Sequence, residues 1–169
     1  MLDFNECIKV GIAGYKIASA PSKLVTLGLG SCVGVCIYDI SKRTGALVHI
    51  LLPSKNDYVT KHSVDLKYAD IAIPVVIEEM LSLGCRTKSM RAVVVGGGNM
   101  FKFDGKPLSE SIGYKNQDSV KKILNSYNIP IVREDTGGEL GKTVFFDTST
   151  GDVYVKIGLE TTKIYKGYI

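Results

Sequence analysis

Hydrophobic positions occur along most of the chain in short runs, and glycines or polar turns separate these runs. Runs rich in β-branched and aromatic residues predict strands at residues 8–19, 24–28, 33–39, 46–52, 91–97, 129–135, 142–148 and 152–158. The polar turn SKRTG lies between the third and fourth runs, which therefore predict an antiparallel hairpin.

Two segments have the spacing of helices. In residues 64–83 the apolar side chains recur every three or four positions, with Ser63 as N-cap and Gly84 as stop signal. A second helix is predicted at residues 117–127. The pattern as a whole indicates a mixed α and β protein.

Length and composition indicate one domain that spans residues 1–169. The chain is 45% hydrophobic and 22% charged, which suits one sizeable core and is short for two. The net charge of +4 comes from residues scattered along the chain, without the basic stripe that nucleic-acid binding usually requires. Neither a leader sequence nor a membrane-spanning run is visible, so we expect a cytoplasmic protein without direct membrane insertion.

The four cysteines, Cys7, Cys32, Cys36 and Cys85, are expected to be thiols in a reducing compartment. Cys32 and Cys36 have a C-x3-C spacing, which differs from the usual zinc knuckle and lacks a second pair of ligands. We therefore expect neither a metal nor an organic cofactor.

The most unusual segment is LGLGSCVG at residues 27–34. A dinucleotide-binding loop would need glycine at position 33, where Val33 stands, and the segment leads into a strand rather than a helix. A sharp turn at Gly28 and Gly30 would instead place the N–H groups of Ser31 and Cys32 near a thiol, as in an oxyanion hole. Catalysis would also require a lowered thiol pKa and an adjacent base, whereas a structural Cys32 would simply fill the core.

His49 is the candidate base, because a polar ring within the apolar strand ALVHILL needs an explanation. The alternative is a core histidine with a satisfied hydrogen bond. The predicted hairpin places His49 opposite a residue between 34 and 36, with Cys36 nearer in the simplest register and Cys32 a diagonal step or two away. The pattern alone thus indicates a Cys/His pair without choosing the cysteine, and it predicts that His62 is an exposed loop residue.

Five segments together resemble the CheD family, the chemoreceptor glutamine deamidases of bacterial and archaeal chemotaxis. These segments are VTLGLGSCVGVCIYD at 25–39, GALVHILLP at 45–53, GGGNMF at 96–101, IGYKN at 112–116 and DTGGELGK at 135–142. The chain departs modestly from the family pattern, with Gly98 where Ala is usual and with Lys115 and Lys142 where Arg is usual.

The resemblance implies a fold, a reaction and a set of residues. The fold would be an α/β layered sandwich with a mixed, mainly antiparallel sheet and two main helices, similar to the catalytic domains of deamidating bacterial toxins. Cys32 would be the nucleophile, His49 its base and Thr26 the third member, beside an oxyanion turn at Gly30 and Ser31. They would convert receptor glutamines to glutamates through a thioester, and glutamyl methyl esters could be hydrolysed in the same way.

The implied partners are chemoreceptor cytoplasmic domains and the CheC phosphatase. One alternative is therefore a non-catalytic module that docks to CheC and regulates it. A second alternative is a cysteine amidase that acts on a small molecule.

Overall fold

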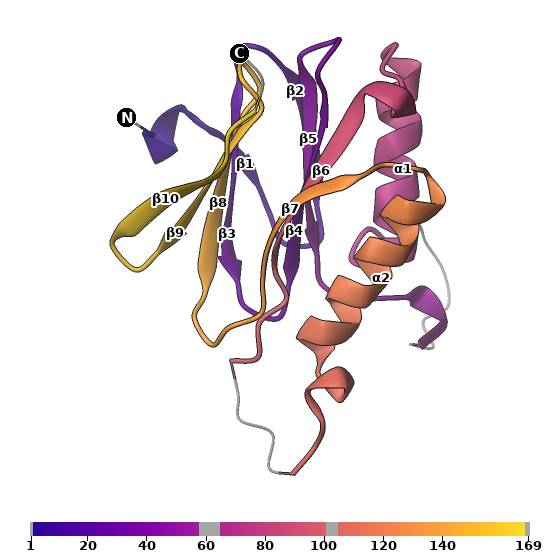
Figure 1. The fold of residues 1–169 in the computed structure, drawn as a ribbon, viewed down its shortest axis with the longest axis vertical. Coiled ribbons are helices and arrows are strands. Elements are labelled where there is room, and N and C mark those ends of the chain that lie inside the picture. The colour runs from indigo at the N-terminus through magenta and orange to yellow at the C-terminus, as the bar shows by residue number, and fades with distance from the viewer. Residues whose placement is uncertain (1, 58–64, 101–104, 168–169) are drawn as a thin grey trace.

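The computed structural model describes residues 2–57, 65–100 and 105–167. These residues form three layers, which are an outer sheet, a central sheet and a pair of helices (Figure 1). The outer sheet has the order β1 (Ile8–Val10), β3 (Lys23–Leu29), β8 (Lys142–Asp147), β9 (Asp152–Ile157), β10 (Glu160–Tyr165). The central sheet has the order β2 (Tyr15–Ser19), β5 (Thr44–Ile50), β4 (Val33–Asp39), β6 (Met90–Gly96), β7 (Ile131–Thr136). The helices are α1 (Ala69–Ser82) and α2 (Ile112–Ser126).

Both sheets are mixed, as predicted, and mainly antiparallel. β1 pairs with β3 and β6 pairs with β7 in parallel, whereas the other strand pairs are antiparallel. The central sheet is apolar on both faces, because the helices cover one face and the outer sheet covers the other. Every residue of β4 and β5 is buried, which explains why these strands appear in the sequence as nearly continuous apolar runs.

The hairpin prediction is confirmed. β4 and β5 pair across the turn at residues 40–43, and His49 lies opposite Gly34, inside the predicted range. Since side chains alternate across a strand, His49 shares a face with Leu47 and therefore points between the two sheets.

The prediction of one strand at residues 8–19 is wrong. The chain turns at residues 11–14, where Ala13 has a φ of 58°, and β1 and β2 then join different sheets. The strand β10 was not predicted, because four of its six residues are exposed and its sequence ETTKIY has little apolar character.

The predicted helix boundaries are also wrong at two N-termini. α1 begins at Ala69, because Tyr68 is extended and bridges Leu52 at the end of the hairpin; Ser63 and Val64 lie outside the described residues. The stop at Gly84 is confirmed by its φ of 86°. α2 begins at Ile112, five residues before the predicted start, because the Ser111 side chain caps it by accepting from the backbone N–H of Tyr114.

Candidate active site

Three glycine-rich loops meet near the start of α2, at the lower end of the molecule in Figure 1. They comprise the β3–β4 turn at residues 28–32, the end of β6 at 96–98 and the β7–β8 loop at 137–138. Backbone hydrogen bonds join them: Gly97 N to Cys32 O at 2.7 Å, Gly98 N to Gly30 O at 2.7 Å, Asn99 N to Gly138 O at 2.8 Å and Gly137 N to Gly96 O at 2.9 Å. The turn that carries Cys32 is therefore fixed by its neighbours.

Two of these glycines are required by geometry. Gly28 has a φ of 71°, in the left-handed region that other residues avoid. At Gly96, with a φ of 98°, a Cβ atom would lie 2.4 Å from the carbonyl oxygen of Cys32. Gly28 lies within β3 at a register irregularity between Thr26 and Leu29, just before the turn into β4, and Gly96 allows β6 to approach the candidate nucleophile.

The β7–β8 loop is anchored by Lys142. Its side chain is buried, and its Nζ donates to the carbonyl oxygen of Asp135 at 2.9 Å and to the carboxylate of the same residue at 2.8 Å. The lysine at this position therefore holds the loop from within. Lys115, the other lysine where arginine is usual in the resembled family, is exposed on α2.

Cys32 lies at the end of the β3–β4 turn, directly before β4, with 8% of its surface exposed. Within the described residues, no other residue accepts a hydrogen bond from the backbone N–H of Ser31 or Cys32, although the N–H of Cys32 interacts with the thiol of the same residue. Ser31 also lines a small hollow of about 140 Å³, together with Gly98, Asn99, Met100, Ser111, Ile112 and Gly113. The turn thus provides a thiol, two available N–H donors and an adjoining space.

His49 is fully buried between the sheets, and its tautomer follows from Thr26. The two side chains are joined by a 2.7 Å hydrogen bond between Thr26 Oγ1 and His49 Nδ1. The single hydroxyl proton of Thr26 is donated to the carbonyl oxygen of Val10 at 2.8 Å. Thr26 must therefore accept from Nδ1–H, which leaves a lone pair on Nε2.

The Nε2 atom of His49 is buried and has no hydrogen-bond partner among the described residues. Burial lowers the pKa of His49 to about 4, so the ring is a neutral base at physiological pH. Burial also raises the pKa of the Cys32 thiol, although the residue's own backbone N–H acts in the opposite direction. At rest Cys32 is therefore a thiol and His49 a neutral imidazole, with no hydrogen bond between them, and the lowered thiol pKa expected from the sequence is not found.

Cys36 differs from Cys32 in its position along the chain and in its exposure, although both side chains lie on the same face of this strand region. It lies opposite Leu47 in the middle of β4, only 2% exposed, and burial strongly raises the pKa of its thiol. Its surroundings are the apolar side chains between the sheets. These features favour Cys32 where the sequence pattern alone left both cysteines open, while His62 lies outside the described residues.

Asn116 is a polar residue at this site to which sequence reasoning assigned no role. It is fully buried on α2, and its Nδ2 donates to the carbonyl oxygens of Ser31 at 2.9 Å and Leu51 at 3.0 Å. A signal was present in the sequence, because Asn116 lies on the stripe formed by the buried residues Gly113, Val120 and Leu124 of this helix. A polar residue on a buried stripe indicates a specific partner.

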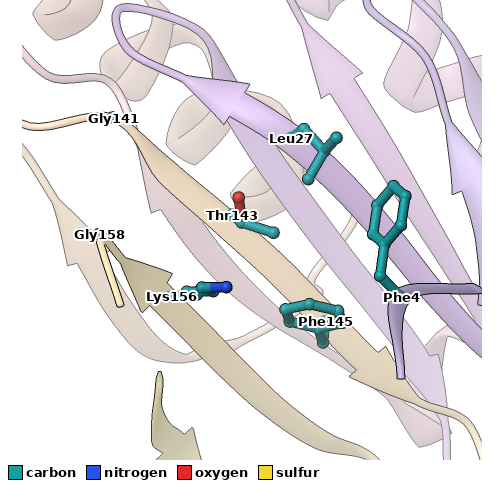
Figure 2. A pocket seen from close by; sticks show the side chains of 7 residues that line it. All are labelled: Phe4, Leu27, Gly141, Thr143, Phe145, Lys156 and Gly158. Atoms are coloured by element: carbon teal, nitrogen blue, oxygen red, sulfur yellow. The ribbon is translucent and has the colours of Figure 1, made fainter. Parts of the chain in front are cut away.

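A larger hollow of about 400 Å³ lies on the outer face of the outer sheet, away from Cys32 (Figure 2). Figure 2 shows that its walls come from β3, β8, β9 and the N-terminal segment, through Phe4, Leu27, Gly141, Thr143, Phe145, Lys156 and Gly158. These residues include neither a nucleophilic thiol nor a carboxylate nor an imidazole. The hollow is therefore a poor candidate for the catalytic site.

Among the described residues, no three His, Cys, Asp or Glu side chains come together as metal ligands do. The same residues include no helix that is both long and apolar enough to span a membrane.

Comparisons with known proteins agree with the resemblance seen in the sequence. The family model described as CheD chemotactic sensory transduction matches residues 51–157. The chain is 44% identical over 164 residues to the "Probable chemoreceptor glutamine deamidase CheD" of Clostridium botulinum (strain Hall), covering 96% of this chain and 100% of the relative. Its identity to the protein of the same name from Clostridium novyi is 43% over 149 residues, covering 88% of this chain and 91% of the relative.

Among solved structures, the hypothetical protein YfiH of Bacillus licheniformis aligns with a TM-score of 0.45 and 13% sequence identity. This alignment covers 72% of the present chain and 49% of YfiH.

Proposed function

This chain belongs to the CheD family, and we propose that it hydrolyses glutamine side chains of chemoreceptors to glutamate, with Cys32 as nucleophile. His49 is the general base in this proposal, and Thr26 orients its ring. Gly30 and Ser31 form the turn that presents the oxyanion donors. Residues 1–169 act as a single deamidase domain, related to the catalytic domains of deamidating bacterial toxins.

The observation that carries the proposal is the state of His49. Its Nδ1–H is held by Thr26, while its Nε2 is buried without a partner. A buried polar atom without a partner costs about 1–3 kcal/mol, so a purely structural histidine is poorly explained here. A general base, in contrast, requires a free lone pair.

In the first half of the proposed reaction, the Cys32 sulfur attacks the carboxamide carbon as its proton passes to His49 Nε2. The carbonyl π electrons move to oxygen, and the N–H groups of Ser31 and Cys32 stabilise the oxyanion. The oxyanion then re-forms the carbonyl, the C–N bond breaks, and the proton on Nε2 leaves with the nitrogen as ammonia. A thioester with Cys32 remains.

In the second half, water attacks the thioester while His49 Nε2 accepts one of its protons. The C–S bond then breaks, and the proton returns to sulfur. The net change consumes one water and yields glutamate and ammonia. A glutamyl methyl ester would follow the same route with methanol as leaving group, so esterase activity is part of the proposal.

The substrate is the cytoplasmic part of the receptors, and the proposed location of the protein is the cytoplasm. The name of the relatives supports a chemoreceptor substrate. CheC phosphatase is the second proposed partner, and it is the basis of the alternative in which the chain acts only by docking.

The test is mass spectrometry of a chemoreceptor cytoplasmic fragment from the same organism, incubated with the protein and, in parallel, with Cys32→Ala. Each converted glutamine adds about one dalton to the fragment, and this gain should disappear with Cys32→Ala because the attacking sulfur is lost. If the unaltered protein converts no glutamine, the docking alternative replaces the proposal. If Cys32→Ala converts glutamine at the normal rate, the proposed nucleophile is wrong.

A further inference from the structure

We propose that Asn116 is a positioning residue that aims the backbone N–H of Cys32 at the reacting oxygen. The idea rests on the proposed cysteine mechanism and adds a residue to it. Asn116 touches neither the thiol nor the imidazole through its hydrogen bonds; it donates to the carbonyl oxygens of Ser31, directly before Cys32, and of Leu51, two residues after His49.

The argument begins with the peptide bond between Ser31 and Cys32. The carbonyl of Ser31 and the N–H of Cys32 belong to one planar trans unit, so they point in opposite directions. Asn116 Nδ2 holds that carbonyl oxygen at 2.9 Å. Fixing the oxygen fixes the direction of the N–H, from which no other described residue accepts a hydrogen bond.

The second proton of the same amide reaches the strand that carries the base. It is donated at 3.0 Å to the carbonyl oxygen of Leu51, two residues beyond His49. A single side chain from α2 therefore ties the turn of the nucleophile to the end of the strand of the base. These contacts span 85 and 65 positions in sequence, so only the folded chain makes them.

The hydrogen bonds also fix which way the amide faces. Exchanging its nitrogen and oxygen would place Oδ1 against two carbonyl oxygens, which repel it. In the observed orientation Oδ1 is buried without a donor among the described residues. An apolar side chain of similar size would avoid this cost, so the two N–H donors explain the asparagine better than core stability does.

The test separates reactions of Cys32 that form an oxyanion from one that does not. Acylation by p-nitrophenyl acetate passes through a tetrahedral oxyanion, whereas alkylation by iodoacetamide requires the thiolate but forms no oxyanion. We expect Asn116→Leu to slow acylation of Cys32 about 100-fold, as expected when an oxyanion donor is misplaced. Its alkylation rate should stay at the level of the unaltered protein.

Ser119→Ala is the matched control. Ser119 lies one turn further along α2, and its hydroxyl donates to the carbonyl oxygen of Pro53, so this variant also removes a hydrogen bond between the helix and a loop. Acylation and alkylation should both be unchanged in it. Rates measured in Cys32→Ser are subtracted to remove labelling of the other cysteines, and thermal unfolding reports whether each variant folds.

Two results would overturn the inference: unchanged acylation in Asn116→Leu, or an equal loss of acylation and alkylation in a folded variant. If Asn116→Leu does not fold, Asn116→Ala removes the same donors. It is judged by the same quantity, the ratio of the acylation rate of Cys32 to its alkylation rate. The readout is independent of the natural substrate. Failure of the unaltered protein to convert receptor glutamine would therefore reject the proposed function. The ratio of acylation to alkylation would still decide this inference.

Discussion

Cys32 and Cys36 begin with much in common: both are buried thiols, four residues apart, on the same face of the same strand region. Their surroundings differ because Cys36 lies within the strand ladder and Cys32 lies just before it. The N–H of Cys36 belongs to a residue paired with neighbours on both sides, whereas no other described residue accepts a hydrogen bond from the N–H of Cys32. Ser31, the residue before Cys32, lines the hollow of about 140 Å³, whereas the hollow that Cys36 lines holds only about 10 Å³.

The comparison teaches that burial of a cysteine is a poor guide to its role. Desolvation raises the pKa of both thiols. What distinguishes Cys32 is that it lies just before the strand, so the backbone N–H groups of Ser31 and Cys32 are not used in the strand ladder. Three experiments test the proposed roles of Cys32, Thr26 and His49.

The largest expected effect comes from exchanging each cysteine separately. Cys32→Ser should reduce receptor deamidation by about 10⁴-fold or more, since a hydroxyl cannot replace the sulfur in this setting. Cys36→Val should keep the deamidation rate and change the free energy of unfolding by less than about 1.5 kcal/mol, because it nearly conserves volume in an apolar site. Initial rates by mass spectrometry and urea unfolding measure the two quantities. Loss of activity in Cys36→Val alone would reverse the assignment.

A smaller effect is expected from Thr26→Val, which keeps the shape of the side chain and removes the acceptor for His49 Nδ1–H. Without that hydrogen bond the ring loses its fixed tautomer, and we expect kcat to fall about 100-fold with little change in KM. Thr143→Val is the control, because Thr143 lines the hollow on the outer face of the outer sheet. Equal activity in both variants would remove Thr26 from the mechanism.

The smallest effect concerns acid pH. Burial lowers the pKa of His49 to about 4, so its ability to accept a proton is lost only as the pH falls through that value. At pH 5 about nine-tenths of the rings should remain neutral, whereas an ordinary histidine would be almost wholly protonated. We therefore expect kcat/KM at pH 5 to be close to its value at pH 7. A fall of more than about tenfold in protein that circular dichroism shows to be folded would contradict the buried base.

The sequence pattern predicted the pairing of neighbouring strands in the β4–β5 hairpin well. The pairing of the hairpin, and with it the position of His49 opposite Gly34, followed from two apolar runs and a polar turn. Patterns within one segment failed where pairing with another segment decides the outcome. Tyr68 is extended because it bridges Leu52, and β10 forms on β9 despite its exposed residues.

The site itself shows the same limit. The pair of Thr26 and His49 joins two different sheets, and no periodicity of either strand predicts which residues meet across that interface. Resemblance to a family supplied Thr26 and the choice of Cys32. The role of Asn116 emerged only from contacts made by the folded chain, although its position on a buried stripe was visible beforehand.

The hydrogen bond between Thr26 and His49 also bears on when the chain becomes chemically competent during its own folding. Its two residues come from separate sheets, and the contacts of Asn116 add a helix from the second half of the sequence. A nascent chain with only the β4–β5 hairpin formed holds a thiol and an imidazole without the groups that orient them. In the proposed mechanism, reactivity toward glutamine would therefore arise only after both sheets and α2 have assembled, and an incomplete chain would lack it.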